Sequence, residues 1–214
     1  FKIKKMSKKN IAILTVLLAI ILDQVLKIYI KTTYALNGGF EVFSWFQIHF
    51  VENNGMAMGF EFGGETGKLF LTLFRIIAVF AIVYWLVGNI KRKVHNAVIV
   101  GIALIFAGAV GNIIDSVFYG IIFDSSNNNI ATLFADQPYG TLFHGKVVDM
   151  FYFPFIKDAI LPEWIPFIGG DTFTFFQYIF NPADAYISVG VALLFIFSKQ
   201  AFPKEEKEKK NIKA

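Results

Sequence analysis

Four long apolar stretches constrain this chain more than any other feature of its sequence. They cover residues 10–30, 68–87, 96–118 and 176–197. Because about 20 apolar residues are needed to cross a bilayer as a helix, each stretch predicts a membrane-spanning helix. The chain is 56% hydrophobic and only 17% charged, against about 25% charged residues in soluble domains, and this agrees with a membrane setting.

The distribution of Lys and Arg predicts how the chain is oriented. Fourteen of its 20 Lys and Arg residues lie before the first stretch, between the second and third, or after the fourth. Basic residues concentrate on the cytoplasmic side of membrane proteins. Both termini, including the charged tail at 199–214, are therefore expected in the cytoplasm. Segments 36–62 and 119–175 are expected on the outer side.

The first outer segment, 36–62, predicts a small β-sheet on the outer membrane surface. Phe46, Ile48 and Phe50 alternate with their neighbours as in a half-buried strand, and the turn residues 53–55 follow. The second, 119–175, predicts a long outer insertion that is too aromatic for a disordered linker. The expected fold class is an all-α membrane protein of one domain, 1–214, with four transmembrane helices, this outer sheet and the insertion.

Five ionisable residues fall inside the predicted spans. They are Asp23, Lys27, Arg75, Asp115 and Asp184. A charge near the bilayer centre costs about 2.5–3.5 kcal/mol, so these side chains are expected to face the bundle interior or one another. Asp23 and Lys27 are four residues apart and share one helix face. They are interpreted either as a structural ion pair or as substrate contacts.

Asp115 and Asp184 suggest proton chemistry. The helical rise puts them roughly 28 Å and 21 Å from the cytoplasmic ends of their spans, so they are expected at one level in the outer leaflet. Two carboxyl groups that meet share one proton. The charged member then takes a proton from a water that attacks a peptide carbonyl, and the protonated member donates to the oxyanion. In a simpler interpretation they are helix-end residues, with Asp184 capping the fourth span.

Other chemistries have little support in the sequence. The absence of cysteine excludes disulfides, thiol catalysis and thiolate metal sites. His49, His95 and His144 are scattered without the spacing of a metal motif. No cofactor, metal or nucleic-acid partner is expected.

Taken together, five motifs in order resemble the lipoprotein signal peptidase family, also called signal peptidase II. They are Asp23-x-x-x-Lys27, the stretch from Asn53-Asn54-Gly55 to Gly59, Gly111-Asn112-Ile113-Ile114-Asp115, Val147-Val148-Asp149 and Phe180-Asn181-Pro182-Ala183-Asp184. Each motif alone is weak, but five in this order on this topology are specific. The resemblance covers residues 10–198.

The resemblance implies an intramembrane aspartyl endopeptidase of the bacterial cytoplasmic (inner) membrane, with Asp115 and Asp184 as its dyad near the outer leaflet. Its partners would be membrane lipid and prolipoproteins, cut before a cysteine that carries a diacylglyceryl group. The residues implied to bind substrate or support the dyad are Asn53, Gly55, Asn112, Asn181 and Ala183. The implied structural residues are Asp23, Lys27, Arg75 and Asp149.

Two departures from the family pattern stand out. The family usually has Arg directly after the first catalytic Asp, where this chain has Ser116, and Arg75 is a candidate substitute. Extra length at about 120–144 and 156–175 predicts a lid or a docking surface. The competing functions are a small proton-coupled transporter and a structural membrane subunit with buried ion pairs.

Overall fold

The computed structural model describes residues 6–55 and 64–202. Within them, three helical stretches are long and apolar enough to cross a membrane, and they confirm the first three predicted spans. These stretches are Lys8–Lys31, Thr66–Lys91 and Asn96–Ile122. The helix nearest the fourth predicted span, α5 (Pro182–Ile196), has 15 residues and is followed by the short α6 (Ser198–Ala201).

The long helices are apolar on most of their surface, as helices that face lipid are. Helix α1 (Lys8–Lys31) begins where the Ser7 hydroxyl accepts a hydrogen bond from the Asn10 backbone N–H. On α2 (Gly64–Lys91), Phe70, Phe80 and Tyr84 are at least 70% exposed in the isolated chain. Such large apolar side chains belong in the acyl region of a bilayer.

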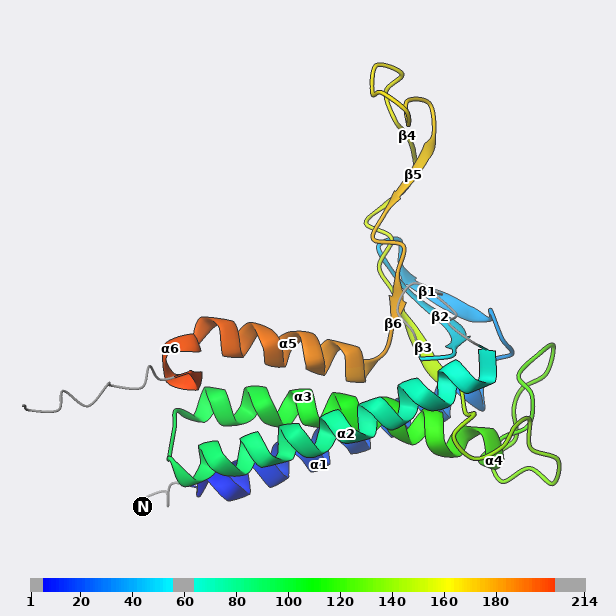
Figure 1. Cartoon of the computed structure of the whole chain (residues 1–214). Coiled ribbons are helices and arrows are strands. Elements are labelled where there is room, and N and C mark those ends of the chain that lie inside the picture. The colour runs from blue at the N-terminus through cyan, green and yellow to red at the C-terminus, as the bar shows by residue number, and fades with distance from the viewer. Residues whose placement is uncertain (1–5, 56–63, 203–214) are drawn as a thin grey trace, which may run out of the picture.

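Helix α3 (Asn96–Ile114) is central and packs against α1, α2 and α5 (Figure 1). Small residues let α3 and α5 approach closely. A Cβ atom on Gly108 would lie 2.3 Å from the Ala183 carbonyl oxygen, and one on Gly190 would lie 2.5 Å from the Gly101 carbonyl oxygen. Beyond α3 the helix widens into a π-helical turn, η2 (Asp115–Tyr119), and ends with α4 (Gly120–Ile122).

A four-stranded antiparallel sheet lies at the outer end of the bundle, in the order β1-β2-β3-β6. Its strands are β1 (Gly39–Phe43), β2 (Phe46–Asn53), β3 (Val147–Tyr152) and β6 (Ile179–Phe180). Val51 pairs with Asp149, and Phe151 pairs with Phe180. The sheet was expected within 36–62, of which residues 56–63 lie outside the described part. Two of its strands come instead from the predicted insertion and from the start of the predicted fourth span.

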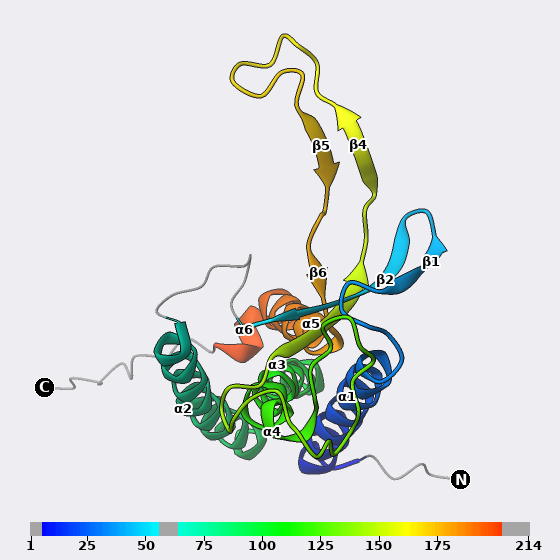
Figure 2. The same ribbon diagram turned by 90° about the vertical axis from the view of Figure 1, so that its right-hand side faces the viewer.

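The two parts of the insertion are built differently. Residues 123–146 pack on the bundle, where the buried Lys31 Nζ forms an ion pair with Glu52 and donates to the Ser126 hydroxyl at 2.8 Å. The same ammonium lies 5.0 Å from the centroid of the Tyr139 ring. Residues 156–175 instead form a hairpin that projects from the molecule (Figures 1 and 2). Its strands are β4 (Ile156–Ile160) and β5 (Thr172–Phe175).

Two apolar clusters hold the bundle together, with a polar layer between them along α1 and α3. The cluster at the end of the bundle away from the sheet consists of Ala12, Leu86, Val98, Ile99, Ile102, Leu194 and Ala201. The cluster beneath the sheet consists of Ile30, Phe50, Tyr119, Phe123, Ala131, Val148 and Met150. The polar layer between them contains the buried side chains of Asp23, Lys27 and Asp115.

Candidate active site

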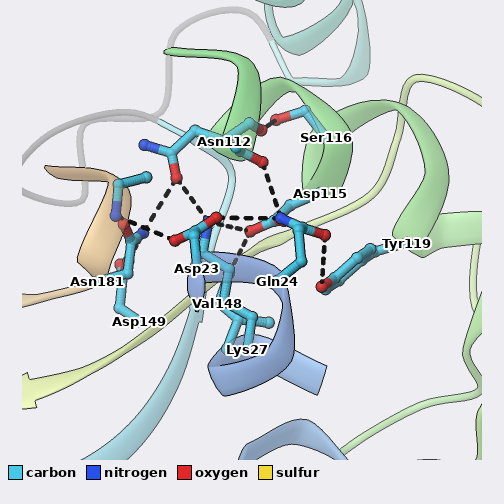
Figure 3. A network of polar contacts seen from close by, with 12 residues as sticks. Asp23, Gln24, Lys27, Asn112, Asp115, Ser116, Tyr119, Val148, Asp149 and Asn181 are labelled. Carbon is cyan, nitrogen blue, oxygen red and sulfur yellow. Dashed lines mark hydrogen bonds and ion pairs between the residues drawn. The ribbon is translucent and has the colours of Figure 1, made fainter. Parts of the chain in front are cut away.

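A buried ammonium group lies at the centre of the polar layer. Lys27 is fully buried, and its Nζ lies 3.0 Å from Asp23 Oδ2 and 2.8 Å from Asp115 Oδ2 (Figure 3). It also donates to Asn112 Oδ1 at 2.9 Å. Buried charges are stable only when paired and hydrogen-bonded, and these three contacts meet that requirement. The contacts favour the structural interpretation of Asp23 and Lys27 over direct substrate contact.

The two acids paired with Lys27 each hold a second element in place. Asp23 Oδ1 accepts the Ala183 backbone N–H at 3.0 Å, directly before Asp184. Asp115 Oδ2 accepts the Val148 backbone N–H at 3.3 Å, directly before Asp149. One lysine with two partners thus fixes the backbone that carries both Asp149 and Asp184.

Asp115 itself is fully buried at the start of η2. In addition to Lys27 and the Val148 N–H, its Oδ1 accepts from Gln24 Nε2 at 3.0 Å. The Gln24 carbonyl oxygen in turn accepts from the Tyr119 hydroxyl at 3.1 Å (Figure 3). Both carboxylate oxygens of Asp115 are therefore occupied by protein donors.

Asn112 connects the lysine to Asp184, and its contacts determine how its amide is oriented. Because the Lys27 ammonium can only donate, the Asn112 atom that faces it must be the carbonyl oxygen. The Asn112 amide nitrogen then points at Asp184 and donates to Oδ1 at 2.9 Å. Lys27 and Asn112 therefore stand between Asp115 and Asp184.

Asn181 joins the two remaining acids. It is the N-cap of α5, where its Oδ1 accepts from the Asp184 N–H at 3.0 Å and Asp184 Oδ2 accepts from the Asn181 N–H at 3.3 Å. This reciprocal capping box fixes the side chains of both residues. The Asn181 amide nitrogen is left to donate to Asp149 Oδ1 at 2.6 Å and to Asn112 Oδ1 at 3.1 Å.

Asp149 lies on β3 opposite Asn181 and is 4% exposed. Its Oδ2 accepts from Asn53 Nδ2, and the Asn53 carbonyl oxygen faces the Gly55 N–H of its own turn. Burial raises the pKa of Asp149 to about 7, and the nearby charge of Asp184 adds to the increase. The hydrogen bonds from Asn181 and Asn53 act in the opposite direction without cancelling it.

Asp149 and Asp184 both line a cavity of about 320 Å³ beside the sheet. The other lining residues are Asn53, Gly55, Arg75, Asn112, Val147, Tyr178, Ile179 and Phe180. Asp115 is not among them. The cavity walls are amide groups and aromatic side chains, a combination suited to an extended peptide with an apolar substituent.

Arg75 and Ser116 have separate environments. The Arg75 guanidinium reaches the cavity from α2 and donates to the Gly55 carbonyl oxygen. Ser116 is buried, and its hydroxyl donates to the Asn112 carbonyl oxygen at 2.9 Å within its own helix. Arg75 therefore supplies a positive charge to the site from a different helix than the one that carries Ser116.

The structure brings Asp23, Lys27, Asn53, Asn112, Asp115, Asp149, Asn181 and Asp184 into one network, while residues 56–59 of the second motif lie outside the described part of the chain. Sequence reasoning missed Gln24 and Tyr119, which complete the surroundings of Asp115, although a polar Gln next to Asp23 in an apolar helix was a usable signal. Within residues 6–55 and 64–202, no group of three or more His, Asp or Glu side chains is gathered as a metal site requires.

Comparisons with known proteins agree with the motif pattern. The profile of the family described as signal peptidase (SPase) II matches residues 15–200. A lipoprotein signal peptidase of Porphyromonas gingivalis is 50% identical over 190 residues, which cover 88% of this chain and 82% of that protein. One of Amoebophilus asiaticus is 35% identical and covers 86% of this chain and 75% of its own length.

A solved structure shares the fold. It is described as a bacterial membrane enzyme and is 29% identical to this chain. The two superpose with a TM-score of 0.57, over 92% of this chain and 93% of the other. The similarity thus extends over the helices, the sheet and the polar layer together.

Proposed function

This chain belongs to the signal peptidase II family, and we propose that it is an aspartyl endopeptidase that removes signal peptides from diacylglyceryl-modified prolipoproteins. The cut would lie directly before the lipid-bearing cysteine. A carboxylate pair in one cavity is the observation that carries this proposal. Family membership favours the peptidase over the transporter and the structural subunit considered from the sequence.

The proposed dyad is Asp149 with Asp184, in place of the Asp115 and Asp184 pair expected from the sequence. Asp149 and Asp184 line the same cavity, and Asn181 contacts both carboxyl groups. Asp115 lies outside that cavity and has Lys27 as its permanent counter-charge. An acid that is already ion-paired and saturated with donors is poorly suited to exchange protons with water, so Asp115 is assigned a positioning role.

The mechanism follows from the unequal surroundings of the two acids. With its raised pKa, Asp149 holds the proton near neutral pH, and Asp184, which accepts from the Asn112 side-chain amide and the Asn181 backbone N–H, is assigned the role of base. Asp184 takes a proton from a water molecule as that water attacks the scissile carbonyl carbon. Asp149 donates its proton to the carbonyl oxygen, which becomes a hydroxyl of the tetrahedral intermediate. Collapse of the intermediate breaks the C–N bond, and a proton returned from the dyad leaves with the new amine.

Hydrogen bonds to the substrate backbone are proposed for Asn53, Gly55 and Arg75. They stand on the cavity wall across from the start of α5, where an extended chain would pass. Asn112, Asn181 and Ala183 act by holding Asp184 in position. No metal takes part in this scheme, because each proton transfer is assigned to a carboxyl group.

The proposed membrane placement has four crossings, with both termini in the cytoplasm of a bacterial inner membrane. Helix α5 spans about 22 Å at 1.5 Å per residue, which is less than the hydrocarbon core of about 30 Å. Its first turn, with Asp184, would therefore lie inside the outer leaflet. A cysteine anchored by two acyl chains in that leaflet would present its peptide bond at this depth.

The direct test is cleavage by the full chain, purified in detergent. The substrate is a synthetic lipobox peptide with a diacylglyceryl group on its cysteine, and the matched control is the same peptide with a free thiol. We expect cleavage on the N-terminal side of the cysteine in the modified peptide only. Equal cleavage of both peptides, or cleavage of neither by folded protein, would contradict the proposed substrate class.

A further inference from the structure

The hairpin of residues 156–175, here called the arm, projects sideways from the bundle across the direction of the helices (Figures 1 and 2). Its strands β4 and β5 form a separate sheet of two strands. A two-stranded hairpin is only marginally stable in water unless it packs against another surface. The arm is therefore expected to pack against another surface.

One face of the arm is lined by apolar side chains, and the other carries Thr172 and Thr174 together with Ile160, which stands opposite Thr172 and is 76% exposed. Along β5, Phe173 and Phe175 point to one side and Thr172 and Thr174 to the other, because successive side chains of a strand alternate. Across the pair, Ile156 stands opposite Phe175 and Ala159 stands opposite Phe173. On the polar side, the Thr174 hydroxyl accepts from the Asp158 backbone N–H at 3.3 Å.

The apolar face is uncovered in the isolated chain. Ile156 and Phe175 are each 50% exposed, and Phe173 is 40% exposed. At the tip, Trp164 is 80% exposed and Phe167 is wholly exposed. An apolar patch of this extent marks a contact with another protein or with a membrane.

The arm leaves the bundle at the level of the outer lipid–water boundary. From β6 the chain passes through Asn181 straight into α5, so the base of the arm lies where that helix begins. In the proposed membrane placement, α5 begins within the outer leaflet, so the base of the arm lies at that depth. The arm extends along the membrane from there. Its free strand edges and its charged residues rule out the hydrocarbon centre, since unpaired backbone groups are not tolerated there. These charged residues are Lys157, Asp158, Glu163 and Asp171.

Aromatic rings connect the arm to the cavity. Phe155 lies 6.1 Å from Phe176, and Phe176 lies 6.1 Å from Phe180, which lines the cavity beside Asp184. Trp45 on the β1–β2 turn stacks on Phe155 at 6.5 Å. Trp, Tyr and Phe side chains are well suited to the headgroup boundary, where one part of the ring meets lipid and another meets water.

We propose that the arm is an interfacial membrane anchor, which lies in the headgroup boundary of the outer leaflet with its apolar face toward the acyl chains. The polar face with Thr172 and Thr174 contacts water. The partner surface is bilayer lipid, and the anchor holds the cavity at the depth of a lipid-bearing cysteine. This assignment does not depend on the identity of the catalytic acids.

Tryptophan quenching on the two faces tests the proposal. In the full chain, Trp45, Trp85 and Trp164 are replaced by Phe, and one new tryptophan is introduced as Phe173→Trp or, as the matched control, as Thr174→Trp. Both proteins are reconstituted into nanodiscs whose lipids carry bromine near the top of the acyl chain. Iodide is the aqueous quencher. Because only one face meets lipid, we expect bromolipid to quench Phe173→Trp at least about twofold more than Thr174→Trp, and iodide to show the reverse order.

Three outcomes would overturn the proposal. Equal quenching of both positions by iodide would put the whole arm in water. Equal quenching of both positions by bromolipid would mean that the two faces of the arm contact lipid equally. Protection of Phe173→Trp from both quenchers would mean that protein, such as a second copy of the chain, covers the face. The native Trp164 in a Trp45→Phe, Trp85→Phe variant gives an independent reading at the tip, where bromolipid quenching is again expected.

Discussion

At the residue scale, the different roles of four acids, three of them buried, decide how the site works. Asp23 and Asp115 form ion pairs with Lys27 and accept hydrogen bonds from backbone N–H groups. Asp149 and Asp184 line the cavity instead. The carboxyl groups are chemically identical, so their roles differ only through their surroundings. Lys27 is the counter-charge of the first two, whereas Asp149 and Asp184 form no ion pair within residues 6–55 and 64–202, which leaves them available for proton transfer.

The pH dependence of cleavage follows from the raised pKa of Asp149. Because Asp149 must hold its proton to act as the acid, the rate is expected to fall as pH rises through about 7. The rate also falls at low pH, because the scheme needs one carboxyl group of the dyad without a proton. The measurement is kcat for the lipidated peptide across pH 5 to 9, which the account predicts to be bell-shaped. A rate that keeps rising from pH 7 to 9 would contradict protonated Asp149.

Individual residues also show which parts of the site could be predicted from the sequence and which could not. Asp23, Lys27, Arg75, Asp115 and Asp184 were identified because a charge in an apolar span is visible without any structure, and the five motifs added Asn53, Asn112, Asp149 and Asn181. The pairing of Asp149 with Asp184 was not visible, because it depends on β3 meeting β6 across the chain. Asp149 lies outside the apolar spans, so its burial could not be inferred from hydropathy.

At the element scale, helix spacing controls the position of Asp23. A Cβ atom on Gly111 would lie 2.5 Å from Asp23 Oδ2 and 3.3 Å from the Ala183 Cβ. The absence of a side chain at Gly111 thus lets α1, α3 and α5 meet around the polar layer. The same requirement for small residues recurs along α3 and α5 at Gly108 and Gly190.

The prediction at this scale is that Gly111→Ala lowers both stability and cleavage. Forcing a methyl group into a packed interior costs about 1–3 kcal/mol, and here it displaces the carboxylate that holds the Ala183 N–H. Gly88→Ala on α2 is the matched control, since no atom lies within 4 Å of the added Cβ and alanine favours helix by roughly 0.5–1 kcal/mol. Thermal unfolding in detergent and the cleavage rate are measured for both. If Gly111→Ala behaved like Gly88→Ala, the close contact would have no consequence.

Helices and strands were predicted well where a short stretch of sequence determines them. They were predicted poorly where pairing with a distant segment determines them. The length of the apolar stretches located α1, α2 and α3, and alternation located β2. Strands β3 and β6 were missed because each gains its partner from a distant part of the chain. The π-helical turn at Asp115 has no sequence signature, although such turns are frequent at functional sites.

At the scale of the whole molecule, the proposed membrane placement puts the polar layer below the outer surface, with the sheet over it. The first part of the insertion packs on the bundle, where Lys31 contacts Glu52 and the Tyr139 ring, and its role as a lid stays a prediction. The second part is the arm, which projects from the bundle across the direction of the helices.

The pH dependence of folding distinguishes the two kinds of acid across the whole molecule. The pKa of Asp149 rises from an ordinary value of 3.8 to about 7 on folding, so the folded state binds more protons between these values. Stability is therefore lost as pH rises through that window. Asp149→Asn cannot ionise and escapes this loss. Asp115→Asn removes a partner from a buried ion pair, which is destabilising by about 3–5 kcal/mol.

The most direct test of the account is kcat for Asp149→Asn on the lipidated peptide at pH 7, with the unfolding temperature measured on the same sample. Loss of a proton-transfer group predicts a decrease of about 10²–10⁴-fold without a lower unfolding temperature. Asp115→Asn, assayed in parallel, is expected to unfold at a lower temperature. Wild-type cleavage by Asp149→Asn, together with an inactive but fully stable Asp115→Asn, would contradict the assignment and return the dyad to Asp115.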